Sequence, residues 1–78
     1  MKYNDLFPVV LITWEDAETD HGWEEHESIG GDLPIAYTIG FLVKETKGYY
    51  LVASTITEDS NNGRFKIPKS MVTSMKRL

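Results

Sequence analysis

The sequence predicts a small all-β domain, and two patterns carry this prediction. Apolar and β-branched residues alternate with polar ones at period two, which is typical of strands with two unlike faces and excludes a fold dominated by helices. Gly, Asn and Pro residues divide these stretches at short intervals and predict turns between them. With 78 residues the chain has room for one domain, covering residues 1–78.

The first predicted strand covers residues 9–15 and opens just after Pro8. It is rich in β-branched and aromatic residues, and alternation places Val10, Ile12 and Trp14 on one face. The other face carries Val9, Leu11 and Thr13. Both faces are expected to be partly covered, as in a central strand of a small barrel.

Residues 35–45 form the strand that the pattern supports best. Large apolar residues recur at every second position on one face, at Ile35, Tyr37, Ile39, Phe41 and Val43. The other face carries Ala36, Thr38, Gly40, Leu42 and Lys44. Gly40 predicts either a β-bulge or a close approach of another backbone segment. A turn at 46–48 then leads into a returning strand over residues 49–57.

A turn cluster at 58–63 precedes a short strand over 64–67, with Phe65 and Ile67 pointing inward. Pro68 has no amide proton to donate and therefore ends that strand. A single 3₁₀ turn would carry the chain into its last stretch, residues 72–78. Two alternatives remain for this stretch. Its first residues are poor helix formers and favour a strand. A terminal helix would gather the apolar residues Met71, Val72, Met75 and Leu78 on one face.

Together these elements predict a small, five-stranded, partly open barrel of SH3-like or Sm-like type, with an OB-like barrel as the alternative. A bend at Gly40 would let one strand serve both halves of the sheet. A long polar loop over residues 16–34 follows the first strand. Because this loop is long for a compact domain, we expect a helical turn around residues 23–28 or a functional loop.

The composition excludes several classes of protein. Without cysteine there is no disulfide framework, zinc ribbon or thiol nucleophile. The longest apolar run, residues 9–12, is far shorter than the roughly 20 residues that span a bilayer, and the N-terminus does not resemble a secretory signal. We therefore expect a cytoplasmic protein. A domain this small has a thin stability margin, which makes a homo-oligomer a candidate state.

Charge is distributed unevenly along the chain. Eight acids and no Lys or Arg lie from Glu15 to Asp32, and five bases and no acid lie from Arg64 to the end. One interpretation is a solvated acidic loop that pairs with the basic tail across the fold. The alternatives are an acidic surface for a basic partner and a basic rim for phosphates. The net charge of −4 argues against a general nucleic-acid binder.

No catalytic or metal motif is present. His21 and His26 are five residues apart, which is not the i, i+4 spacing of a helical zinc pair, and the acids around them lack calcium-loop spacing. The adjacent acids at 15–16 and 58–59 are expected to point to opposite faces. Neither a nucleophile elbow nor a phosphate-binding glycine loop occurs. We expect no enzyme activity, no cofactor and no metal.

The candidate binding residues are aromatic, acidic or basic. An exposed Trp is an effective interface residue, although one tryptophan fits a core position and the other fits a cap on an open barrel end. The basic residues could line an anion site, although positive charge also protects an edge strand against unwanted pairing. The candidates for ligand or partner binding are Trp14, Asp16, Trp23, Arg64, Lys66 and Lys69.

Two parts of the chain also carry a family resemblance. The segment V-L-I-T-W-E-D-A at residues 10–17 is followed by an acidic loop with Gly22 and Trp23. The segment G-F-L-V-K-E at 40–45 runs on to F-K-I-P-K-S-M-V at 65–72 and to Leu78. In this order, and over nearly the whole chain, they resemble small accessory proteins encoded by tailed phages and prophages.

The resemblance implies a protein that acts by binding in the cytoplasm of the infected bacterium, where it inhibits a host or defence protein. The Trp-Glu-Asp-Ala and Ile-Pro-Lys-Ser-Met segments are the ones expected to contact a partner. The alternative is an oligomer that sequesters a small anionic nucleotide messenger between subunits, with Arg64, Lys66 or Lys69 on its phosphates. Nucleic acid is not an expected partner, because the net charge is negative and the Sm sequence signatures are absent. Membranes are not expected partners either, because no apolar run is long enough to span one.

Overall fold

The computed structural model describes residues 2, 5–15 and 34–78. Within them, five strands form a single antiparallel sheet in the order β4-β3-β2-β1-β5. A short 3₁₀ helix, η3, joins the last two strands. The elements are β1 Val9–Glu15, β2 Ile35–Glu45, β3 Tyr49–Ile56, β4 Asn61–Pro68, η3 Lys69–Met71 and β5 Val72–Arg77.

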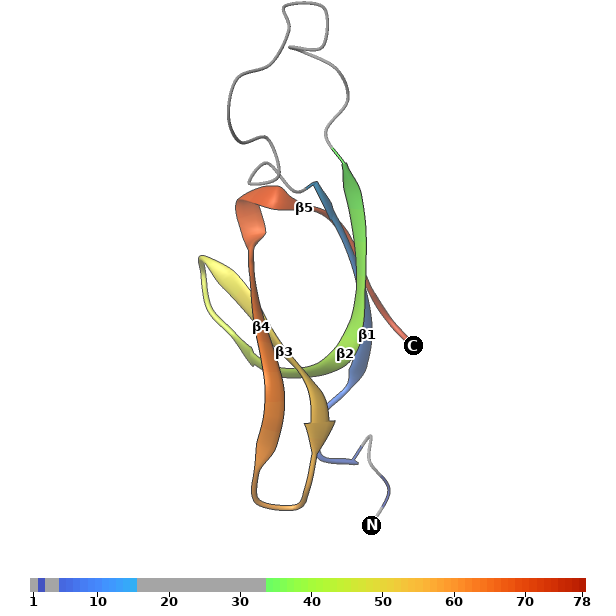
Figure 1. Ribbon diagram of the computed structural model, residues 1–78, viewed down its shortest axis with the longest axis vertical. Helices are drawn as coiled ribbons and strands as arrows, with labels where there is room; N and C mark the ends of the chain where they lie inside the picture. The colour runs from blue at the N-terminus through green and yellow to red at the C-terminus, as the bar shows by residue number, and fades with distance from the viewer. Residues whose placement is uncertain (1, 3–4, 16–33) are drawn as a thin grey trace, which may run out of the picture.

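The all-β prediction is confirmed: the described residues contain five strands and no α-helix. Figure 1 shows β2 bending strongly, so that the sheet curls back on itself with β4 and β5 as its two edges. The SH3-like or Sm-like type of the barrel stays a prediction. The helical turn expected around residues 23–28 lies outside the described residues.

The core lies inside this curl. Val10 and Ile12 of β1, Val52 of β3 and Ile67 of β4 are almost completely buried there. Burial of each such side chain stabilises the fold by about 1.5–3 kcal/mol. Partly buried hydrophobic residues complete the cluster at its margin, namely Ala36, Tyr50, Met71, Val72 and Met75.

The last stretch is a strand, so the helical alternative for residues 72–78 is wrong. β5 pairs with β1 in antiparallel fashion, and Met75 lies opposite Ile12. The 3₁₀ turn predicted before it is also present, at Lys69–Met71. β4 begins at Asn61 rather than Arg64 and ends at Pro68, so the turn before it is tighter than expected: the Thr57 amide donates to the Ser60 carbonyl at 2.8 Å.

β2 turns its larger apolar residues away from the core. Gly40 and Leu42 are buried against the inner face, whereas Ile35, Tyr37 and Ile39 are 57%, 70% and 65% exposed. The reason is steric, because the inner side of a strongly bent strand has room only for small residues at the bend. A Cβ on Gly40 would lie 2.9 Å from the carbonyl oxygen of Ala53, so this glycine marks a close backbone approach.

The bulge in the β2–β3 ladder lies further along, between Leu42 and Lys44, and not at Gly40. It returns Lys44 to the outer face, opposite Leu51 of β3. The hairpin turn after β2 is the predicted one. The Thr46 amide donates to the Tyr49 carbonyl at 2.9 Å, and the Thr46 hydroxyl accepts from the Gly48 amide at 3.1 Å.

Candidate functional site

The outer surface of β2, β1 and β5 carries a continuous group of exposed apolar side chains. Ile39 of β2 pairs with Leu11 of β1, and Leu11 pairs with Lys76 of β5, so alternation places these side chains on one surface. We call this surface the apolar face; it consists of the exposed side chains of Ile35, Tyr37, Ile39 and Leu78 and the half-buried side chain of Leu11.

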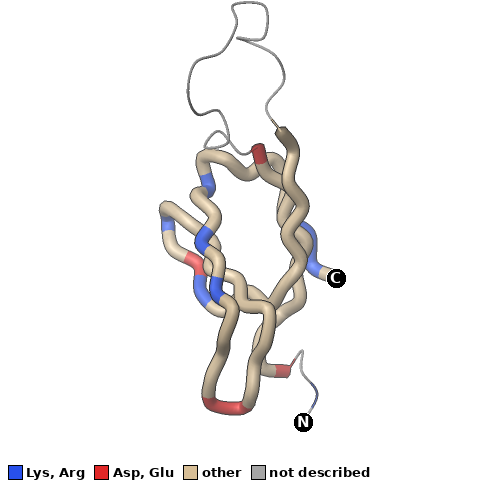
Figure 2. Tube along the Cα trace, viewed as in Figure 1, with Lys and Arg blue, Asp and Glu red and all other residues tan. Residues whose placement is uncertain are grey.

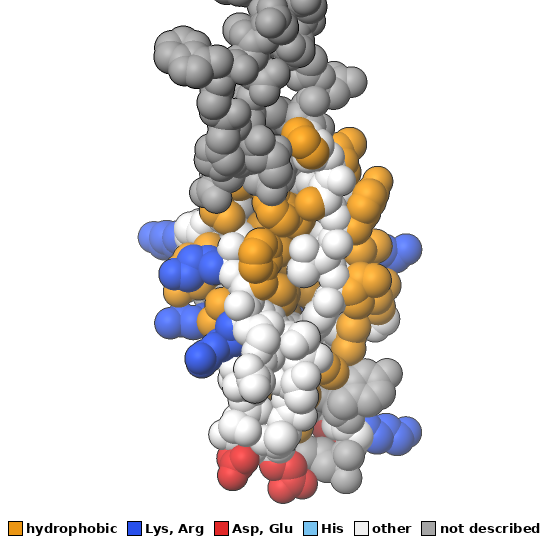
Figure 3. Space-filling view, viewed as in Figure 1, with side chains coloured by type: hydrophobic (Ala, Val, Ile, Leu, Met, Phe, Trp, Pro, Cys, Tyr) orange, Lys and Arg blue, Asp and Glu red, His pale blue; other side chains and the backbone are white. Residues whose placement is uncertain are grey.

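Leu78 joins this face at its lower corner. Its amide donates to the Val9 carbonyl at 2.8 Å, which continues the β1–β5 ladder by one residue, and its side chain is 66% exposed. Among the described residues five large hydrophobic side chains are exposed, and four of them therefore lie on the apolar face. Figure 3 shows hydrophobic side chains gathered on this side of the molecule.

Two charges of opposite sign border the apolar face. Glu15 lies opposite Ile35 at the end of β1, and Lys76 lies opposite Leu11 on β5. Contiguous apolar patches on the surface of a protein often mark the site at which a partner binds. Two rim charges of opposite sign can fix the orientation of such a partner through complementary charges on its surface. Because the two charges cancel, they do not repel a partner of either net charge.

A second surface, on the outer side of β3 and β4, is basic. Lys66 pairs with Leu51, which pairs in turn with Lys44 on β2, and Arg64 lies two residues along β4 on the same side. The ammonium of Lys66 lies 4.5 Å from the ring centroid of Tyr49. We call this surface the basic face; it consists of Lys44, Tyr49, Leu51, Arg64 and Lys66.

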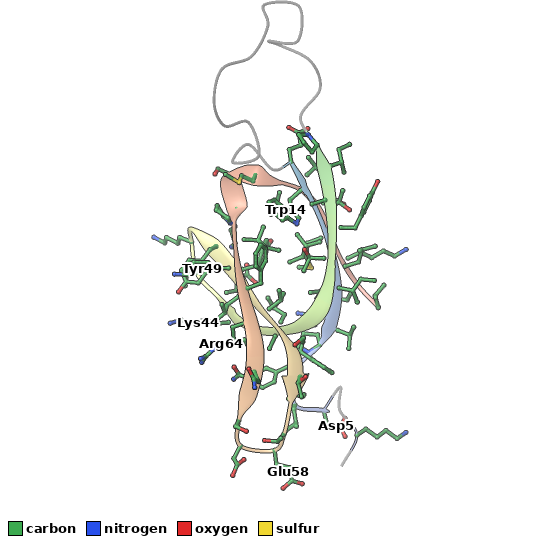
Figure 4. All side chains as sticks on the ribbon, in the orientation of Figure 1. Asp5, Trp14, Lys44, Tyr49, Glu58 and Arg64 are labelled. Carbon is green, nitrogen blue, oxygen red and sulfur yellow. The ribbon has the colours of Figure 1, made fainter. Side chains whose placement is uncertain are left out.

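Figure 2 shows the basic positions along β4 and at the neighbouring hairpin, on the side away from the apolar face. In Figure 4 the side chains of Lys44, Tyr49 and Arg64 lie on this same side. Alternation along β4 brings Arg64 and Lys66 together, as the sequence predicted. Lys44 and Tyr49 were missed, because only the strand pairing and the bulge after Leu42 bring them to the same surface.

Lys69 is separated from the other two basic candidates. It begins η3, and its ammonium forms an ion pair with Glu45 at 2.7 Å and lies 4.9 Å from the ring centroid of Tyr50. Because its charge already has a carboxylate partner, Lys69 has less to offer an incoming anion than Arg64 or Lys66. The contact links the start of η3 to the end of β2.

Trp14 occupies the core. It is 7% exposed, its indole Nε1 donates to the Thr38 hydroxyl at 3.0 Å, and its ring centroid lies 5.7 Å from that of Phe65. Figure 4 shows its side chain inside the curl of the sheet. Phe65 shares the inner side with Ile67, as predicted, but remains 46% exposed at the margin. A role for Trp14 in partner binding stays a prediction.

Asp16 and Trp23, the other two candidates, lie outside the described residues, as do His21 and His26. In the described part of the chain, no group of three His, Asp or Glu side chains is placed to hold a metal ion. No helix in residues 2, 5–15 and 34–78 is long and apolar enough to cross a membrane.

Asp59, one of the adjacent acids at 58–59, takes part in the turn before β4: its carboxylate accepts a hydrogen bond from the Thr57 hydroxyl at 3.2 Å.

Comparison with known proteins gave no match to a family model, to a curated protein or to a solved structure. The two outer surfaces are therefore the features from which a function can be argued.

Proposed function

We propose that this chain is a non-enzymatic binding protein that inhibits a protein partner by covering it with the apolar face. The observation that supports this proposal most is the exposure of three successive residues on the outer face of β2: Ile35, Tyr37 and Ile39 are 57%, 70% and 65% exposed. Leaving these side chains in water costs roughly 25 cal/mol for each Å² that a partner would otherwise cover.

The resemblance to phage accessory proteins supplies the setting, the cytoplasm of an infected bacterium, and makes the partner a host or defence protein. The partner surface that fits is itself apolar at its centre, with a base near Glu15 and an acid near Lys76 at its rim. Tyr37 is the expected anchor, because tyrosine combines a large apolar ring with a polar tip and is enriched among residues that dominate binding energy.

Two matched double variants test this proposal. Tyr37→Ser/Ile39→Ser removes the centre of the apolar face, and Arg64→Ser/Lys66→Ser removes charge from the basic face. Each protein is immobilised and exposed to host lysate, and captured proteins are identified by mass spectrometry. We expect a host protein captured by the wild type and by the basic-face variant, but not by the apolar-face variant. Equal capture by all three proteins, or none by the wild type, would contradict the proposal.

The second candidate function is sequestration of a small anionic nucleotide on the basic face. It is favoured by Lys44, Arg64 and Lys66 lying on one surface around the ring of Tyr49, where cations can meet phosphates and a ring can stack on a base. Glu45, which follows Lys44 at the end of β2, is paired with Lys69.

Thermal melts with cyclic dinucleotides, cyclic oligonucleotides and NAD-derived signalling molecules test the second candidate. A ligand at about 100 times its dissociation constant adds ~2.7 kcal/mol to the free energy of unfolding, which raises the melting temperature of a small domain by many degrees. We expect the shift to disappear in Arg64→Ser/Lys66→Ser and to persist in Tyr37→Ser/Ile39→Ser. A flat panel with the wild type would remove this candidate.

A further inference from the structure

We infer that two copies of this chain pair through the free edges of their β5 strands, in antiparallel orientation and with Met75 opposite the partner's Met75. The inference concerns a surface that the proposed function does not use. Its starting point is the position of β5 at the end of the sheet, where β1 is its only partner among the described strands.

The β1–β5 ladder determines which backbone groups of β5 remain available. The Leu78 amide donates to Val9, so in an antiparallel ladder the backbone groups of Leu78, Lys76 and Ser74 point toward β1. Those of Met75 and Arg77 then point to the free edge. A free edge of this kind is a template for a further strand, because its amides and carbonyls are already aligned in extended conformation.

Charge disfavours the other edge of the sheet as the partner. β4, the opposite edge of the sheet, carries Arg64 and Lys66 and ends at Pro68, which has no amide to donate. Pairing β4 of one copy with β5 of the next would bring these cations toward Lys76 and Arg77. Like charges opposite each other on neighbouring strands are destabilising. Head-to-tail rings built from these two edges are therefore disfavoured.

Two β5 strands avoid this conflict when they run antiparallel. With Met75 opposite the partner's Met75, each Lys76 faces a Ser74 and each Arg77 faces a Thr73, so no cation lies directly opposite another. A register centred on Arg77 would place two guanidinium groups opposite each other. A register centred on Thr73 would leave the Arg77 end of both strands unpaired. The Met75 register thus pairs the longest stretch without opposing like charges.

Such a pair is isologous, so it closes at two copies. It also makes one sheet of the two, with the apolar faces side by side on the same outer surface. The contact between two short strands is smaller than the ~800 Å² per partner of a typical stable interface. We therefore expect a dimer that forms with rising protein concentration rather than a permanent one.

Sedimentation velocity over a wide concentration range tests the edge. Arg77→Pro removes the free-edge amide, and Arg77→Ala removes the same charge while keeping that amide. We expect the wild type and Arg77→Ala to dimerise, and Arg77→Pro to remain a folded monomer by circular dichroism. Tyr37→Ser/Ile39→Ser is expected to dimerise as the wild type does. Loss of the dimer in that variant would make the apolar face the interface, and a monomeric wild type at all concentrations would also overturn the inference.

Cysteine cross-linking tests the register, since the chain has no natural cysteine. Residues opposite each other in a hydrogen-bonded antiparallel pair have Cα atoms about 5.5 Å apart, which suits a disulfide. We expect Met75→Cys to form an intermolecular disulfide under mild oxidation and Ser74→Cys, whose copies lie out of register, to form much less. Equal cross-linking of both variants would reject the Met75 register.

Discussion

The indole nitrogen of Trp14 donates a hydrogen bond of 3.0 Å to the hydroxyl of Thr38, and this bond joins β1 to β2 on the inner side of the sheet. It explains how a residue with a polar ring atom occupies a core position at 7% exposure. A buried indole N–H without an acceptor would be costly.

Replacing the acceptor tests this relationship. Thr38→Val keeps the shape of the side chain but removes its oxygen, so we expect the free energy of unfolding to fall by about 1–3 kcal/mol. The control is Thr55→Val on the exposed side of β3, which we expect to change stability by less than about 0.5 kcal/mol. Urea unfolding followed by tryptophan fluorescence measures both values, and equal losses would refute the role given to the Trp14–Thr38 bond.

Two glycines provide a matched pair for the bend of β2. A Cβ on Gly40 would lie 2.9 Å from the Ala53 carbonyl oxygen, whereas a Cβ on Gly48 would meet nothing within 4 Å. We expect Gly40→Ala to lower the free energy of unfolding by about 1–3 kcal/mol through overpacking, and Gly48→Ala to leave it unchanged or slightly raised. Thermal melts of the two variants give the comparison. A Gly40→Ala protein as stable as Gly48→Ala would mean that β3 shifts freely away from the bend.

The exposure of the apolar face can be measured without knowing any partner. The dye ANS fluoresces when it binds exposed apolar surface, and we expect a clear signal from the folded wild type. Tyr37→Ser/Ile39→Ser is expected to reduce this signal severalfold, since it removes two of the most exposed hydrophobic side chains. Arg64→Ser/Lys66→Ser serves as the control for a change of charge. The prediction fails if the ANS signal of this control falls as far as that of Tyr37→Ser/Ile39→Ser.

The ion pair between Lys69 and Glu45 is expected to contribute little. Both side chains are partly exposed, at 30% and 48%, and exposed pairs of this kind contribute at most about 1 kcal/mol. We expect Glu45→Gln to lower the free energy of unfolding within that limit at low salt and to have no effect at 1 M salt. Glu58→Gln, in the turn before β4, is the control. A loss of several kcal/mol that salt does not reduce would show that the contact is not a simple surface pair.

The strand pattern of residues 35–45 could be predicted from alternation, but its orientation could not. Periodicity states which residues share a face and leaves open which face the core takes. Here the outward face is the more apolar one, because the bend at Gly40 leaves little room inside. The bend depends on the approach of Ala53 from β3, a contact thirteen positions away in the chain. No local pattern encodes that contact.

The basic candidate residues likewise include positions that local alternation predicts and positions that only long-range contacts determine. Arg64 and Lys66 share a face because they are two residues apart on one strand, and that much follows from local geometry. The pairing of Lys69 with Glu45 spans 24 residues and depends on where η3 lies beside the hairpin. Lys44 lies on the same surface as Arg64 and Lys66 only because the bulge after Leu42 shifts it outward. The surrounding sequence does not predict that bulge.

β2 takes part in both outer surfaces. Its first half carries Tyr37 and Ile39 on the apolar face, and its end carries Lys44 on the basic face. Eleven residues at about 3.3 Å each give the strand a contour length of about 36 Å, and its bend turns the two surfaces to different sides of the molecule. A protein bound to the apolar face and a small anion bound to the basic face would therefore contact different sides of the molecule. One chain could hold both at the same time, at a mutual angle that the curvature of a single strand determines.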